Sequence, residues 1–230
     1  MKRPSIALCS TLCILYLSLL TTACGDGSAM GPVEEIEGLP RALSQSEEML
    51  VDAGNDFAFD FLQRAYQAEP RQNLFVAPLS ASMALGMTMN GTAGTTFDEM
   101  SAALGFGEMS LEEINQGYRD LIDLLKTLDG RVELGIGNSI WYREGFPVRS
   151  DFLTRVETSF DAAIRELDFS TSNAVGVINN WVKEQTRGTI EEIVENPIDA
   201  ATVMFLINAI YFKGDWTARF EGGKTADAPW

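Results

Sequence analysis

The sequence of 230 residues contains no histidine, and this absence limits the chemistry that the chain could perform. It excludes the Ser–His and Cys–His nucleophile pairs and removes the most common protein ligand of transition metals. A hydrolase would need a Ser–Lys or a carboxylate mechanism instead, and no motif in the chain suggests one. We therefore expect no catalytic residue, no metal site and no cofactor, and we interpret the protein as something other than an enzyme.

Cysteines are the other reactive side chains, and the three present, Cys9, Cys13 and Cys24, all lie near the N-terminus. They form neither a CxxC motif nor the spacing of a zinc site. The remainder of the chain is free of cysteine. Disulfide bonds are therefore not expected to hold the fold together.

The N-terminal segment has the pattern of a targeting signal. Lys2 and Arg3 precede an apolar run at 6–20 and a group of small residues, which is typical of a secretory signal peptide and is short for a membrane span. Cys24 also resembles the lipidated cysteine of bacterial lipoproteins, although Thr21 stands where leucine is usual. We expect a signal peptide at 1–23 and a product exported either as a cell-envelope lipoprotein anchored through Cys24 or as a soluble extracellular protein.

Bulk composition indicates an ordinary globular domain with an acidic surface. Hydrophobic residues make up 46% and charged residues 22% of the chain. The net charge of −16 argues against nucleic acid as a partner, because binding phosphates requires basic patches. Residues 24–46 contain Gly, Pro and Glu without a clear period, so we interpret them as a tether before a folded domain at 47–230.

The stretch 203–212 has the strongest signal for a buried strand. It is apolar apart from Asn208 and rich in β-branched and aromatic residues. Because polar and apolar residues do not alternate, we expect a central strand covered on both faces. A buried carboxamide is costly unless it is hydrogen-bonded, so Asn208 should have partners.

Other segments predict helices and strands around this one. The first helix is expected at 47–66, and a short buried strand at 74–76 leads into a buried helix that begins at Pro78. Capping-box spacing occurs at Thr96–Glu99 and again at Ser110–Glu113, where a helix to 128 should follow.

In the second part of the chain, the spacing of apolar residues changes between strand-like and helix-like patterns. Residues 132–142 form a strand with a small-residue face, made by Gly135, Gly137 and Ser139, which a helix can approach closely. A helix capped by Ser150, a strand at 163–169 and an amphipathic helix at 170–187 should follow.

Three motifs in these segments resemble those of the serpins, the serine protease inhibitor superfamily. They are N-x-F-x-x-P-x-S at Asn73 to Ser80, I-N-x-W-V-x-x-x-T-x-G-x-I at Ile178 to Ile190, and N-A-I-Y-F-K-G-x-W at Asn208 to Trp216. They occur in the family's order. The resemblance implies an α+β serpin fold, with helices packed around a large central sheet.

The resemblance also assigns roles to individual residues. Ser80 and Asn208 match the polar cluster beneath the sheet that opens, where they would exchange hydrogen-bond partners; alternatively, Asn208 only satisfies buried backbone groups. Ala77 departs from the serine that is usual before the proline.

A second set, Phe212, Lys213, Gly214 and Trp216, matches the region where the inserting loop begins to enter the sheet. Trp216 could instead be an ordinary core residue, and Lys213 no more than a solvated strand end.

In function, the resemblance implies a suicide substrate. A reactive-centre loop would be cleaved by a target serine or cysteine protease and would insert into the main sheet, trapping the protease. The alternative is a non-inhibitory serpin, a binding or carrier protein. Compared with the family, the C-terminal part that supplies this loop is absent, so we expect a fragment. In that fragment the strand at 203–212 would be an apolar edge that promotes self-association.

Overall fold

A computed structural model describes residues 38–216, 222–224 and 226–227 of the chain. These residues belong to a compact unit that spans 36–230. The predicted signal peptide and Cys24 lie outside the described residues.

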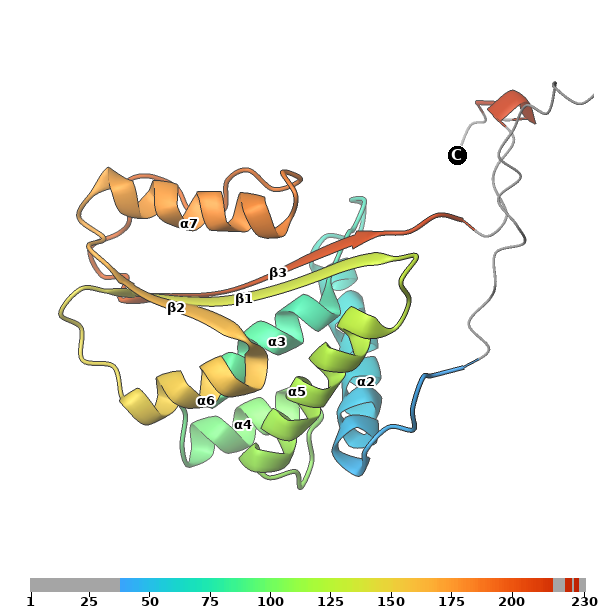
Figure 1. Cartoon of the computed structure of the whole chain (residues 1–230), viewed down its shortest axis with the longest axis horizontal. Helices are drawn as coiled ribbons and strands as arrows, with labels where there is room; N and C mark the ends of the chain where they lie inside the picture. The colour runs from blue at the N-terminus through green and yellow to red at the C-terminus, as the bar shows by residue number, and fades with distance from the viewer. Residues whose placement is uncertain (1–37, 217–221, 225, 228–230) are drawn as a thin grey trace, which may run out of the picture. The chain divides into compact units, whose positions relative to one another are not determined.

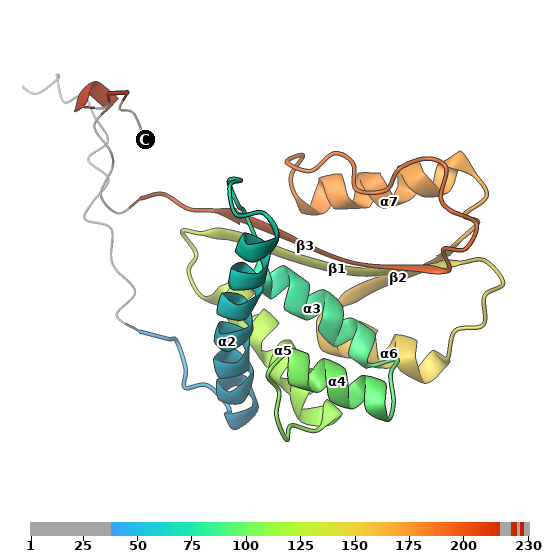
Figure 2. The same cartoon turned by 180° about the vertical axis from the view of Figure 1, so that it is seen from behind.

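A three-stranded sheet of order β2-β1-β3 organises this unit, with helices on both of its faces (Figure 1, Figure 2). The strands are β1 (Glu133–Arg143), β2 (Ala162–Leu167) and β3 (Met204–Lys213). The helices are α2 (Gln45–Ala68), α3 (Pro78–Met89), α4 (Thr95–Ala103), α5 (Leu111–Thr127), α6 (Ser150–Phe160) and α7 (Ser172–Gln185), with a short 3-10 helix η1 (Gly222–Lys224) near the C-terminus.

Strand β1 lies in the middle of this sheet and pairs differently on its two sides. It runs parallel to β2, from Asn138 opposite Ala162 onward. It runs antiparallel to β3, from Glu133 opposite Lys213 to Tyr142 opposite Met204. The sheet is therefore mixed, and β3 is an edge strand within the described part of the chain.

The sheet separates two hydrophobic cores. The larger core lies between one face of the sheet and helices α2 to α6. The smaller core lies between the opposite face and α7 (Figure 1). Alternation along β1 explains this division, because Ile136 and Ile140 face the larger core while Trp141 faces the smaller one. The predicted small-residue face is confirmed: a side chain at Gly137 would collide with Gln185 of α7, at 2.8 Å.

The predicted N-terminal caps of the helices are confirmed only in part. Ser110 and Glu113 form the expected capping box at α5, and Ser44 with Glu47 forms another at α2. The predicted box at Thr96–Glu99 is wrong, because α4 already begins at Thr95 after Gly94.

Two further local predictions are wrong. Ser150 is the first residue of α6 and not its cap, which is Arg149. Residues 74–76 form no strand, and Phe75 is 99% exposed. A strand needs backbone partners, and no described strand pairs with this segment.

The predicted tether overlaps the folded body at its C-terminal end. The Arg41 guanidinium forms two hydrogen bonds, of 2.6 and 2.7 Å, with the carboxylate of Glu47, and it also donates to the Asp120 carbonyl of α5. Glu47 is fully buried, and this pairing holds its pKa at about 2. The ordered body therefore includes residues ahead of α2.

Candidate functional site

Two asparagines on neighbouring strands form the centre of the polar cluster. Asn208 of β3 stands directly opposite Asn138 of β1, and its amide donates a 2.8 Å hydrogen bond to the Asn138 carboxamide oxygen. The Asn138 amide in turn donates to the Phe160 carbonyl, which ends α6, at 2.8 Å. A continuous chain of hydrogen bonds therefore links β3, β1 and the end of α6.

Helix α3 supports this cluster from the side of the larger core. The Ser80 hydroxyl donates to the backbone carbonyl of Asn208 at 3.3 Å, and the sulfur of Met83 lies 3.4 Å from the Asn208 amide nitrogen. Pro78 begins α3, which places Ser80 in its first turn, next to β3. The structure thus brings together Ser80 and Asn208, which are far apart in the sequence.

One atom of the cluster is unpaired. The side-chain oxygen of Asn208 is buried and has no hydrogen-bond partner among the described residues. A buried acceptor without a donor costs about 1–3 kcal/mol. The cluster therefore holds an acceptor that a further donor could satisfy.

Asn138 is a member of this cluster that our sequence analysis did not select as a site residue. It is only 2% exposed and lies between Ile136 and Ile140 on the same face of β1. A single polar residue on an otherwise apolar strand face is the signal that identified Asn208. The same test applied to β1 would have found Asn138.

The second predicted group lies where β3 ends. Phe212 and Trp216 are 67% and 72% exposed, so Trp216 is not a core residue in the described structure. Lys213 and Gly214 are exposed as well, and Gly214 lies beside the Phe212 ring. These four residues form an exposed, partly aromatic segment at the end of β3.

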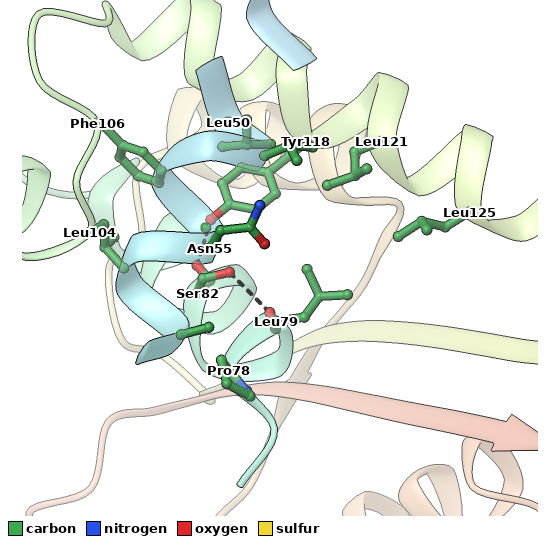
Figure 3. Close-up of a pocket in the computed structure, with 13 residues that line it drawn as sticks. Leu50, Asn55, Pro78, Leu79, Ser82, Leu104, Phe106, Tyr118, Leu121 and Leu125 are labelled. Carbon is green, nitrogen blue, oxygen red and sulfur yellow. Dashed lines mark hydrogen bonds between the residues drawn. The ribbon is translucent and has the colours of Figure 1, made fainter. Parts of the chain in front are cut away.

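A cavity of about 360 Å³ lies among the helices, and its lining does not include Ser80, Asn138 or Asn208 (Figure 3). It is enclosed by α2, α3 and α5 and by the loop before α5, and its lining is mainly apolar and contains no charged residue. Tyr118 projects into it and donates to the Ser82 carbonyl at 2.9 Å; burial raises the pKa of this phenol above its usual value. The cavity therefore offers apolar surface but no acid or base for catalysis.

Across residues 38–216 and the short described stretches after them, no three His, Cys, Asp or Glu side chains are grouped to hold a metal ion. None of the described helices combines the length and apolar composition needed to cross a membrane.

Comparison with known proteins assigns this arrangement of helices and sheet to a family. Residues 52–230 match the family described as "Serpin (serine protease inhibitor)". The chain belongs to the serpin family. The helices and partial mixed sheet are accordingly those of a serpin fold, as the three motifs predicted.

Individual members of the serpin family are similar to this chain in sequence and in structure. The leukocyte elastase inhibitor of Sus scrofa is 34% identical over 185 residues, which cover 79% of this chain and 48% of that protein. The corticosteroid-binding globulin of Homo sapiens is 30% identical over 188 residues, covering 80% of this chain and 46% of that protein. The solved structure of the thermophilic serpin Tengpin in its latent state matches with a TM-score of 0.70 and 33% identity, covering 80% of this chain and 48% of the other.

This serpin chain spans about half the length of the curated relatives it matches. Those relatives include proteins named as an elastase inhibitor and as a steroid-binding globulin. Family membership alone therefore leaves both kinds of function open for the whole protein.

Proposed function

We propose that the whole protein is a serine-type endopeptidase inhibitor that acts as a suicide substrate. In the expected reaction, the serine hydroxyl of the protease attacks a peptide bond of an exposed loop. That peptide bond breaks, and an ester bond to the protease serine forms. The cleaved loop then inserts into the main sheet before water hydrolyses the ester. In this reaction the protease supplies the catalytic residues and the inhibitor supplies none.

The observation that carries this proposal is the state of β3 around Asn208. Within the described residues β3 pairs only with β1, and the Asn208 carbonyl accepts a hydrogen bond from the Ser80 hydroxyl of α3. Asn208 also holds a buried side-chain acceptor that no donor among the described residues satisfies. An added strand beside β3 could supply new partners for both groups, as a sheet that opens and accepts a loop requires.

The segment at the end of β3 supports the same function. An inserting strand would have to pass Phe212 to Trp216 before it reached Asn208. Exposed aromatic side chains there can pack against an arriving segment. We propose that Phe212, Lys213, Gly214 and Trp216 form the region where insertion begins, and that Ser80 and Asn208 respond deeper in the sheet.

A second candidate function is a non-inhibitory binding or carrier protein. The similarity to the corticosteroid-binding globulin of Homo sapiens favours it, because that protein is named for binding a corticosteroid. The two candidates make different demands on the loop. An inhibitor needs small hinge residues that can enter the sheet, whereas a carrier does not.

The protein expressed from its complete gene provides the test. It should be incubated with trypsin-like, chymotrypsin-like and elastase-like serine proteases and with a papain-like cysteine protease. We expect at least one active protease to form a covalent complex that survives boiling in detergent, while the same protease with its nucleophile chemically blocked forms none. Cleavage by every protease without such a complex would refute inhibition and favour the carrier.

We also propose that the protein is exported and anchored through Cys24. Support comes from the pattern of 1–23 alone, since these residues lie outside those described. In a bacterial host, fatty-acid labelling of the mature protein should be lost in Cys24→Ser and retained in the matched variant Cys13→Ser. Export of Cys24→Ser and wild type as the same unlabelled soluble protein would instead show simple cleavage.

A further inference from the structure

Helix α7 ends with an arginine at a position where this type of helix end usually has glycine. The Gly188 amide donates to the Lys183 carbonyl at 2.7 Å and the Arg187 amide to the Glu184 carbonyl at 3.2 Å. This pair of bonds is the Schellman motif, whose left-handed position is usually occupied by glycine. Here that position is held by Arg187, with φ of 50°. A residue with a side chain pays an energetic cost in this conformation that glycine avoids.

The Arg187 side chain provides a reason for this choice. Its guanidinium lies 3.3 Å from the carboxylate of Glu133 and 5.4 Å from the ring centroid of Tyr211. Glu133 begins β1, and Tyr211 belongs to β3. One side chain just beyond the end of α7 therefore contacts both β1 and β3. Figure 1 shows α7 lying over these two strands.

The rest of α7 is attached to the sheet by different contacts. Val175, Ile178 and Val182 pack into the smaller core against Trp141 and Ile207. Toward its C-terminal end the helix places the Gln185 side chain over Gly137 and the Gln185 carbonyl near Gly135. The last residue of α7 in the smaller core is Val182, so residues 183–186 add no apolar core packing before Arg187.

We propose that Arg187 is a latch that holds the C-terminal end of α7 on the sheet and so sets how often this end lifts. As a regulator of loop insertion the latch rests on the proposed function, under which α7, lying over the sheet, would have to move aside for a loop to enter. The lifting itself is a property of this chain and can be measured without any protease.

The contacts of Arg187 with Glu133 and Tyr211 are weak enough for this end of α7 to lift reversibly. Arg187 and Glu133 are both substantially exposed, so their ion pair is weak. Loss of one exposed ion pair together with one exposed cation–π contact should change an opening equilibrium by roughly fivefold. This is large enough to detect and small enough to permit reversible motion.

A buried cysteine can report the lifting. Val182→Cys places a thiol on α7 against the sheet, at a position 1% exposed, and Val156→Cys places a matched thiol in the larger core, at a position fully buried. Peptide mapping measures the rate of maleimide labelling at each introduced cysteine and distinguishes it from labelling at the natural N-terminal cysteines. The first thiol reports α7 lifting, and the second reports global unfolding.

The decisive substitution is Arg187→Gly, because glycine suits the left-handed position better than arginine. If Arg187 served only to end the helix, this variant would label at Val182→Cys no faster than the parent chain. We expect labelling to rise by roughly fivefold at Val182→Cys and to stay unchanged at Val156→Cys. An equal rise at both positions, or no rise at Val182→Cys, would overturn the proposal.

Two further variants test the named contacts. Glu133→Gln should raise labelling at Val182→Cys in the parent chain and have no added effect in Arg187→Gly. Arg149→Gln removes another exposed ion pair, that with Asp151, and should leave labelling at Val182→Cys unchanged. Additive effects of Glu133→Gln and Arg187→Gly, or an effect of Arg149→Gln, would contradict the latch. A failure in these assays would leave protease trapping untouched, and a failure to trap proteases would leave these rates untouched.

Discussion

Asn208 of β3 donates its amide to the carboxamide oxygen of Asn138, the residue directly opposite on β1, at 2.8 Å. The bond lies between hydrophobic side chains of the larger core, and Asn138 continues the chain of bonds to the Phe160 carbonyl. Each asparagine therefore satisfies a group that would otherwise be buried without a partner. The pair ties β3 to its only neighbour within the described sheet.

This pair leads to a stability prediction. Asn208→Ala leaves the Asn138 oxygen without its donor, which costs about 1–3 kcal/mol, but it also removes the unpaired Asn208 oxygen, so we expect the net fall in the free energy of unfolding to be smaller than this. In a double-mutant cycle with Asn138→Ala, the two effects should be non-additive by more than about 0.5 kcal/mol. Urea denaturation measures both, and Asn180→Ala, at an exposed position on α7, serves as the control. Additive losses would show that the two side chains do not act together.

Glu47 should make stability depend on pH in a defined range. Its pKa is lowered from 4.5 to about 2, chiefly by hydrogen bonds from Arg41, so the folded state favours the ionised form. The resulting stabilisation is complete above about pH 5 and is lost as the pH falls through the folded pKa, near 2. Denaturation at pH 7 and pH 3 should show that Glu47→Gln costs about 2–3 kcal/mol at the higher pH and clearly less at the lower one.

Glu113 offers a matched control for this prediction. It occupies the same capping-box position in α5, and hydrogen bonds from Ser110 lower its pKa, but it is exposed and has no arginine in its capping contacts. Glu113→Gln should therefore cost less than Glu47→Gln at pH 7. Equal costs would assign the stabilisation to the cap alone and not to the ion pair with Arg41.

The glycine face of β1 predicts a difference between two similar substitutions. A methyl group at Gly137 would lie 2.8 Å from the Gln185 side chain, whereas one at Gly135 would have no neighbour nearer than 3.5 Å. We expect Gly137→Ala to lower the free energy of unfolding by about 1 kcal/mol and Gly135→Ala to be neutral or slightly stabilising, since alanine loses less backbone entropy than glycine. Thermal and urea unfolding of the two variants check this, and the opposite order would contradict the placement of α7.

The exposed end of β3 should promote self-association. Phe212 is 67% exposed at the end of an edge strand, which can pair with another chain. We expect the 230-residue chain to form concentration-dependent oligomers in sedimentation velocity and Phe212→Lys to reduce them. Phe59→Lys, at a position 75% exposed on α2, should have a smaller effect. A single monomer boundary for the unmodified chain at all concentrations would contradict the prediction.

Long periodic segments were predictable from the sequence, whereas features that depend on distant partners were not. The helix of α5 and the strand of β1 follow local patterns that packing reinforces, so their positions were predicted closely. The segment around Phe75 looked like a strand by composition, but strand formation needs a neighbour that composition does not reveal. At Thr96 the capping pattern was present, and the helix began one residue earlier instead.

The candidate site was predictable to a similar extent. Motif resemblance selected Ser80 and Asn208, and the structure places them in contact. It did not select Asn138, although a single polar residue on an apolar face of β1 was a local signal; only its pairing with Asn208 depends on strand register, which sets residues seventy positions apart opposite each other. Arg187 carried no local signal, since its role depends on a left-handed backbone and on two strands that meet only in the fold.

The thermal stability of the complete protein before and after cleavage tests the central claim most directly. If the main sheet accepts the cleaved loop beside β3, the cut protein gains a strand and new partners for Asn208, so its unfolding temperature should rise well above that of the intact protein. Asn208→Ala should reduce this rise, because the acceptor that the new strand would satisfy is gone. An unfolding temperature that is unchanged or lower after cleavage would show that the loop does not insert, and it would contradict inhibition by the proposed mechanism.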